Sequence, residues 1–288
     1  MTVVARHPID VAASDVEADR LLNGMPRIVD AIVRDPAALF AVMTQSLDEA
    51  GHRTAGDNRA AWADTWRAVV RAMQASSAIF VVAGQPAGEV SFRVDYDVVS
   101  RAGTGPLPFA DAFTWLRALY LAMICRERAR IDALAATPVE LLRASGSAMD
   151  EYAISWVRTW QTYWRGEGGL VDLIIETMRG TNPEQLRHVS EEATLRIHYP
   201  PIELFYRLTQ REDDKFNDAL ADAVDLHRLF WTKDSPEFVR SRHPGGYIAL
   251  APLAIACLAR DAGIAITVES DYLPVHLLEA TRVGEITT

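Results

Sequence analysis

Two adjacent prolines separate residues with catalytic potential in the segment His198-Tyr199-Pro200-Pro201-Ile202-Glu203. Proline lacks an N–H and restricts the residue before it, so we expect one helix to end and another to begin here. Such a corner places Glu203 in the first turn of the second helix. The segment has two interpretations: a rigid corner with a hydrogen-bonded histidine, or a polar cluster at the edge of a pocket.

Further polar side chains follow on the helix expected after this corner, namely Asn217, Asp218, Asp222 and His227. Asp218 and Asp222 are one turn apart and therefore share a face. If a pocket forms, Glu203, Asp218 or Asp222 would hold and deprotonate an amine. His198 or Tyr199 would assist.

Two arginines are candidates for binding an anion. Arg126 follows the apolar run from Trp115 to Ile124, and Arg143 lies in Leu-Arg-Ala-Ser-Gly. The guanidinium group matches carboxylate and phosphate in a bidentate way. The alternative is that both are end-of-helix charges in ion pairs, favoured by the helix dipole.

Aromatic side chains recur on one expected helix. Trp156, Trp160 and Trp164 are spaced i, i+4, i+8, with Tyr152 one turn earlier and Tyr163 alongside. This face is either a seam of the core or a recognition wall, because tryptophan and tyrosine combine large contact area with a polar tip. The same helix begins with two further candidate ligand-binding residues, Asp150 and Glu151.

Several classes of site are not indicated by any motif. The sequence has no His-Glu-x-x-His, no paired Glu-x-x-His, no Gly-x-Ser-x-Gly and no Walker loop. We therefore predict no bound metal and no cofactor. Cys125 and Cys257 each lie in apolar helical stretches, and we interpret them as small core residues, not as a disulfide pair.

Apolar residues recur at three- and four-residue spacing through most of the chain, which predicts a mostly α fold. The expected fold class is an irregular multi-helix bundle or array of antiparallel helices with one small β-hairpin insertion. Glycines at 51, 166, 180 and 263 are expected to end helices. The predicted helices cover residues 10–23, 36–50, 58–82, 109–135, 148–165, 169–179, 183–198, 201–210, 212–231 and 246–262.

The hairpin is predicted from alternation in Glu89–Val94 and in Val98–Ser100, on either side of Asp95-Tyr96-Asp97. We interpret the chain as a single helical domain, 1–288. Its layers would be N-terminal helices in 1–83, the β-hairpin in 84–105 and a C-terminal helical array in 106–288. No low-complexity linker separates these layers.

The composition of the chain argues against two classes of binding partner, nucleic acid and membranes. The formal net charge of −10 disfavours binding to nucleic acid, which requires clustered positive charge. No apolar run is long enough to suggest a membrane span, and the N-terminus has no apolar segment typical of a signal peptide. We therefore expect a cytoplasmic protein with neither a nucleic-acid nor a membrane partner.

The chain resembles the immunity 49 family of actinobacterial polymorphic-toxin loci. The resemblance is carried by several blocks in one order, among them Cys125-Arg126-Glu127, Asp150-Glu151-Tyr152, Gln161-Thr162-Tyr163-Trp164, Tyr199-Pro200-Pro201-Ile202-Glu203-Leu204-Phe205 and the stretch from Leu250 to Asp261. It implies a helical cytoplasmic protein that binds and neutralises a cognate toxin, without catalysis. It carries over no individual binding residue.

Three functions remain open. The first is an immunity-type protein whose acidic surface attracts a basic toxin or effector. The second is a cofactor-free natural-product biosynthetic enzyme catalysing an intramolecular substitution or elimination, such as a cyclisation. In it the carboxylates would activate an amine, and Arg126 and Arg143 would bind an anionic or carrier-bound substrate. The third is a scaffold for a heteromeric partner subunit.

Overall fold

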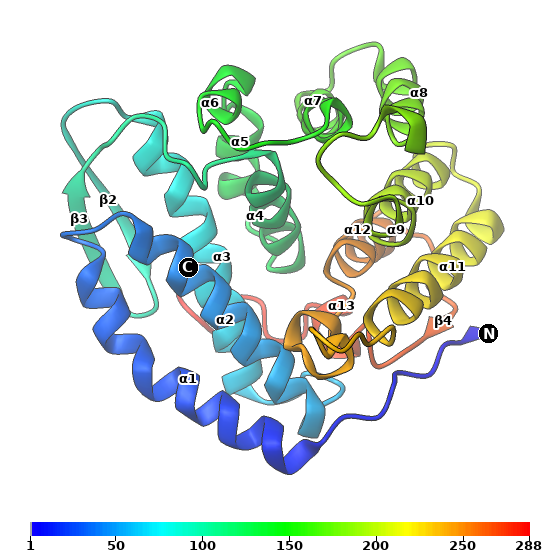
Figure 1. Cartoon of the computed structure of the whole chain (residues 1–288), viewed down its shortest axis with the longest axis horizontal. Coiled ribbons are helices and arrows are strands. Elements are labelled where there is room, and N and C mark those ends of the chain that lie inside the picture. Colours follow the sequence, from blue (N-terminus) through cyan, green and yellow to red (C-terminus); the bar gives the residue numbers. More distant parts are fainter. Residues whose placement is uncertain (1) are drawn as a thin grey trace.

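The computed structural model describes residues 2–288 and is built mainly from α-helices. Figure 1 shows α1 to α3 on the left of the molecule, α8 and α10 to α12 on the right, and α4 to α7 between them. The helices are α1 (Val11–Ala31), α2 (Ala37–Gly56), α3 (Ala63–Gly84), α4 (Ala112–Ile124), α5 (Arg128–Ala135), α6 (Val139–Arg143), α7 (Glu151–Arg165), α8 (Leu170–Gly180), α9 (Glu191–Ala193), α10 (Tyr199–Thr209), α11 (Asp213–Trp231), α12 (Leu250–Asp261) and α13 (Val275–Leu278).

Two small sheets accompany the helices. The predicted hairpin is confirmed: β2 (Glu89–Val94) pairs antiparallel with β3 (Asp97–Ala102). Near the chain's start, β1 (Thr2–Val3) pairs in parallel with β4 (Val268–Glu269), which brings the N-terminal segment beside α11. The mostly α fold class is confirmed.

The packing order explains how distant segments meet. α2 packs between α1 and α3, α3 packs on α4, and α4 in turn contacts α12. α12 also contacts α10 and α11, while α7 lies against α8. Buried apolar side chains form one connected cluster from Val4 to Leu278. Cys125 and Cys257 are buried, unpaired members of this cluster, as predicted.

Among residues 2–288, no helix combines the length and the apolar character that crossing a bilayer requires.

The predicted corner at Pro200-Pro201 is wrong. Helical backbone continues from α9 through a π-helical turn (Thr194–His198) directly into α10, and His198 and Tyr199 keep right-handed helical angles. The Tyr199 N–H donates to the Thr194 carbonyl five residues earlier. A widened turn accommodates residues that cannot donate the usual hydrogen bond, so the prolines change the pitch of the helix without ending it.

Two other predicted helices are interrupted. The helix expected over 109–135 splits into α4 and α5 at Arg126, which adopts a left-handed conformation with φ of 58°. The helix expected over 183–198 begins instead with a short 3-10 turn (Pro183–Gln185) and an irregular segment. In both places side-chain hydrogen bonds to backbone groups, described below, override the helical spacing of apolar residues.

Gly51 does not end a helix, contrary to the prediction; it lies inside α2. A Cβ at this position would stand 2.4 Å from the Pro244 carbonyl oxygen, so glycine is required by a close backbone approach. The 243–246 segment thereby packs directly on α2.

Replacing Gly51 with alanine is therefore expected to lower the free energy of unfolding by about 1–3 kcal/mol, because backbone must move to relieve the contact. Gly24→Ala is the matched control, since a Cβ there meets nothing within 4 Å in the interior of α1. In that variant the free energy of unfolding is expected to rise by about 0.5–1 kcal/mol. Urea denaturation of both variants measures these changes in the free energy of unfolding. Equal changes in the two variants would contradict the prediction.

Candidate functional site

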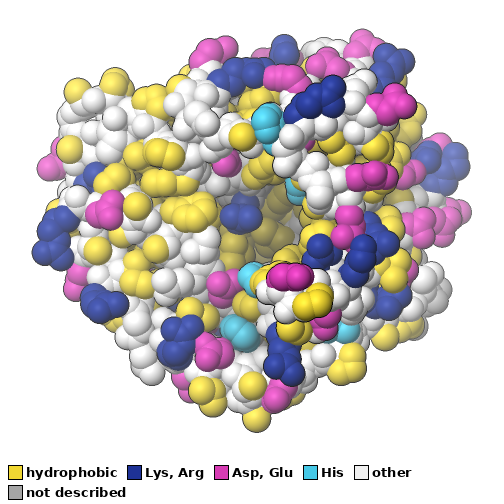
Figure 2. All heavy atoms as spheres, in the orientation of Figure 1, with side chains coloured by type: hydrophobic (Ala, Val, Ile, Leu, Met, Phe, Trp, Pro, Cys, Tyr) yellow, Lys and Arg dark blue, Asp and Glu magenta, His cyan; other side chains and the backbone are white. Residues whose placement is uncertain are grey.

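A cavity of about 620 Å³ lies between the N-terminal helices and the α10–α12 array. Figure 2 shows the surface hollowed at this place, with apolar side chains inside. Its walls come from α2, α4, α10, α11, α12 and the 243–245 segment. Most lining side chains are apolar or aromatic, including Leu47, Phe113, Leu116, Tyr120, Leu121, Trp156, Leu250 and Leu253.

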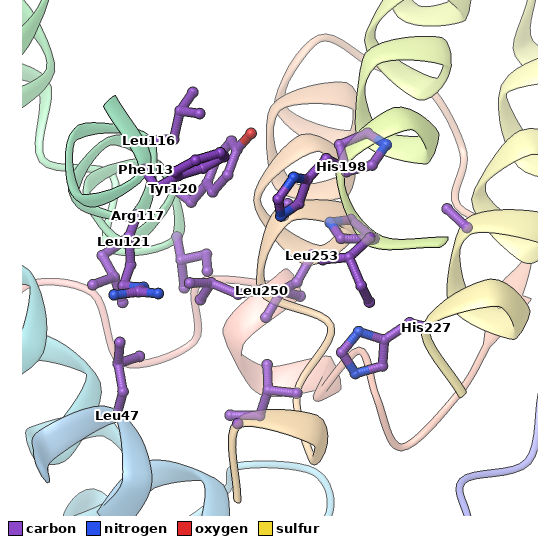
Figure 3. A pocket seen from close by; sticks show the side chains of 18 of the residues that line it. Leu47, Phe113, Leu116, Arg117, Tyr120, Leu121, His198, His227, Leu250 and Leu253 are labelled. Atoms are coloured by element: carbon purple, nitrogen blue, oxygen red, sulfur yellow. The ribbon is translucent and has the colours of Figure 1, made fainter. Parts of the chain in front are cut away.

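His198 faces this cavity because the π-helical turn before α10 presents it there (Figure 3). Its Nδ1 lies 2.6 Å from the Tyr152 hydroxyl, and its ring lies 4.9 Å from that of Phe113. Burial lowers the pKa of His198 to about 4, so the imidazole is neutral near pH 7.

His227 enters the cavity from α11 on the same side (Figure 3). Its Nε2 lies 3.0 Å from the Gly246 carbonyl oxygen, which can accept but cannot donate, so Nε2 carries the proton. Burial lowers the pKa of His227 to about 4. The neutral ring therefore has an unprotonated Nδ1.

Arg117 is a cavity residue that sequence reasoning missed. It extends from α4 toward Leu47 in Figure 3, and among residues 2–288 its guanidinium has no hydrogen bond and no ion pair within 4.0 Å. Desolvation by burial lowers the pKa of Arg117, while the charges of Asp111 and Asp48 act in the opposite sense. A signal was present, because Arg117 is the one charged residue in the apolar helix Ala112–Ile124.

Asp48 on α2 is the second missed residue. It lines the same cavity and likewise has no hydrogen bond or ion pair with the rest of the described chain. Burial raises the pKa of Asp48, and the charges of His243 and Arg117 oppose that shift. The cavity thus contains two opposite charges that do not contact each other, while its third charged lining residue, Arg196, is paired with Glu192 at 3.3 Å.

Replacing Arg117 with methionine is expected to raise the free energy of unfolding by up to about 1 kcal/mol, because a partly buried guanidinium without an ion pair becomes an apolar side chain of similar length. Chemical denaturation at pH 7 measures this. Arg128→Met removes an exposed arginine paired with Asp132 at 2.8 Å and should change stability by less than about 1 kcal/mol. A destabilised Arg117→Met protein would mean that the guanidinium stabilises the fold.

Three of the four predicted catalytic residues lie in a different place. Tyr199, Glu203 and Asp222 line a groove of about 240 Å³ between α10 and α11. Glu203 forms an ion pair with Arg207 at 3.2 Å, and Asp222 is exposed. His198 instead faces the large cavity on the other side of Pro200 and Ala223, which contribute to both surfaces. The structure therefore does not gather the four residues around one space.

The two predicted anion-binding arginines contact different parts of the chain. Arg126 binds Asp261 through two nitrogens at 3.0 and 3.2 Å and also donates to the carbonyls of Ile124, Leu277 and Leu278. It thereby fastens the end of α4 to α12 and α13. Arg143 forms an exposed ion pair with Glu151 at 2.6 Å.

Asp150 is buried and holds a loop. Its carboxylate accepts hydrogen bonds from the backbone N–H groups of Arg187, His188 and Val189. Burial opposes ionisation, but these donors hold the pKa of Asp150 below its usual value. This carboxylate fixes the irregular segment after α8.

The remaining predicted ligand-binding residues make packing or backbone contacts. Trp160 is fully buried with its ring 4.1 Å from that of Phe205, and Tyr163 packs on the same phenylalanine at 5.2 Å. Trp164 is half-buried beneath the Arg128 guanidinium, 5.1 Å away. Asn217 bonds the Ala265 carbonyl and the Thr267 N–H beside β4. The aromatic face of α7 is thus a core seam, and of its residues Tyr152 and Trp156 reach the cavity.

Comparison with protein families gives one match. The sequence model of a family described as immunity protein 49 matches residues 57–277. That range contains Arg117, His198 and His227, whereas Asp48 precedes it. Neither the curated proteins nor the solved structures gave a match.

Proposed function

Because the chain belongs to the immunity protein 49 family, we propose that it binds a cognate toxin or effector protein and neutralises it in the cytoplasm. The observation that carries this proposal is the family match over residues 57–277, which includes most of the helical array. An immunity protein of this type needs an exposed surface complementary to its partner and no catalytic centre.

The exposed face of α11 is the surface best suited to a basic partner. Asp214, Asp218 and Asp222 are spaced i, i+4, i+8 and are all exposed. Within the described residues, none of the three is in an ion pair. Their charges are therefore free to attract a partner, and the overall net charge of −10 acts in the same direction.

The groove beside this face extends the acidic surface. Glu203, Asp222 and Asp225 line it together with Tyr199. Glu203 is paired with Arg207 and Asp225 with Arg228, so within the described residues Asp222 is the groove's carboxylate without an ion pair. Together with Tyr199 it suits one lysine or arginine side chain of the partner, because opposite charge and the ring face both attract a cation.

Co-expression tests the proposal. The effector domain of the proposed toxin, sought among the genes beside this one, should arrest growth when expressed alone, and co-expression of this chain should restore growth. An unrelated immunity protein serves as the control. Growth arrest that this chain fails to relieve, at equal expression, would overturn the proposal.

The enzyme alternative stays a prediction. Its carboxylates and Tyr199 share the α10–α11 groove, but His198, Arg126 and Arg143 lie elsewhere.

A further inference from the structure

The large cavity has the features of a small-molecule site, which a protein-binding function does not require. Its volume of about 620 Å³ falls in the range that holds small organic ligands, roughly 300–1,000 Å³. Its walls are mainly apolar, and a few polar groups converge on it from α2, α4, the π-helical turn before α10, and α11. The hollow in Figure 2 gives it access from solvent.

Three charged side chains line the cavity: Arg196 is paired with Glu192 at 3.3 Å, whereas Arg117 and Asp48 have no ion pair within the described residues. Both side chains are partly buried, and charges that lose part of their hydration usually gain a partner in compensation. Arg117 and Asp48 are close enough for each charge to influence the other, yet no nitrogen–oxygen pair between them lies within 4.0 Å. The two opposite charges therefore line one cavity without contacting each other.

Charge balance selects the class of ligand. A simple anion at Arg117 would add a negative charge beside Asp48, and a simple cation at Asp48 would add a positive charge beside Arg117. A zwitterion satisfies both: its carboxylate meets the guanidinium and its ammonium group meets the carboxylate. The neighbouring His198 and His227 rings are neutral, so they do not disturb this balance.

The apolar wall selects the rest of the molecule. Phe113, Tyr120, Leu121, Leu250 and Leu253 surround the space next to Arg117 in Figure 3. Burial of an aromatic or long aliphatic group against them supplies binding energy that polar groups alone do not.

We propose that this cavity binds an α-amino acid with a large apolar side chain, with Arg117 holding the carboxylate and Asp48 the ammonium group. This inference goes beyond toxin neutralisation and does not depend on it. The cavity site and the acidic face of α11 are formed by different residues.

Isothermal titration calorimetry with purified full-length protein tests the assignment. The probes are L-tryptophan, L-phenylalanine and L-leucine, each compared with analogues that lack one charge, namely tryptamine and 3-phenylpropionate. The complete amino acids should bind at least about ten-fold more tightly than either analogue, because each charge-assisted hydrogen bond is worth about that factor or more.

Two variants identify the site. Arg117→Met and Asp48→Asn should each weaken binding of the best amino acid by about 10- to 100-fold. Arg20→Met and Asp132→Asn, which change exposed charges outside the cavity, should leave it unchanged. Circular dichroism of every variant separates loss of the site from loss of the fold.

Three results would overturn the assignment. The first is no binding by any of the three amino acids at millimolar concentration. The second is binding that Arg117→Met and Asp48→Asn leave unchanged. The third is a loss of toxin binding in Arg117→Met without any amino-acid binding by the unaltered protein, which would show that the cavity receives a side chain of the partner.

Discussion

Replacing Arg71 with alanine is expected to lower the free energy of unfolding by about 3–5 kcal/mol. The Arg71 side chain is 1% exposed and pairs with Glu49, which is 2% exposed. Arg71 also donates to Ser46 at 2.8 Å and lies 3.6 Å from Asp95. It therefore links α2, α3 and the hairpin turn. Its removal leaves a buried carboxylate with one of its two arginines and opens a cavity in the core.

Urea denaturation at pH 7 measures this loss. The control is Arg20→Ala, which removes a pair between side chains that are 66% and 44% exposed and should cost about 1 kcal/mol or less. A double variant, Arg71→Met with Glu49→Leu, should recover most of the loss, because it removes both charges and keeps the volume. Equal destabilisation by Arg71→Ala and Arg20→Ala would contradict this explanation.

Charge reversal on α11 is expected to slow association with the toxin at least about ten-fold. The variant Asp214→Lys, Asp218→Lys, Asp222→Lys replaces the unpaired exposed acidic face by a basic one, so a basic partner is repelled where it was attracted. Stopped-flow or surface-binding kinetics at low salt measures the association rate. The effect should shrink as salt is raised, because mobile ions screen exposed charges.

A matched variant separates local from overall charge. Asp15→Lys, Asp30→Lys, Asp172→Lys makes the same change in net charge at exposed positions on α1 and α8. It should slow association much less. Equal slowing by both variants would show that net charge, and not the α11 face, attracts the partner.

Much of the fold could be predicted from local sequence. Helix-spaced apolar residues located most of the long helices, and alternation with turn residues located the β2–β3 hairpin. The failures occurred where tertiary contacts decide the backbone. Gly51 marks a close approach of Pro244, and Arg126 ends α4 because its guanidinium binds groups about 135 to 152 residues away.

The cavity could not be predicted in the same way. Asp48 and Arg117 come from helices far apart in the sequence, and no spacing relates them. Arg117 was visible as a single charge in an apolar helix, but its meaning depends on what faces it. The Pro200-Pro201 pair drew attention to the right segment, although the π-helical turn places His198 on the opposite side of α10 from the Glu203 groove.

The proposed function requires that this chain bind a toxin directly. The direct test is isothermal titration calorimetry of the purified chain with the purified effector domain of the proposed toxin, sought among the genes beside this one. A 1:1 complex with a nanomolar dissociation constant, about −12 kcal/mol, is the predicted result. No detectable heat and no co-elution at micromolar concentrations, with a catalytically active effector domain, would contradict it.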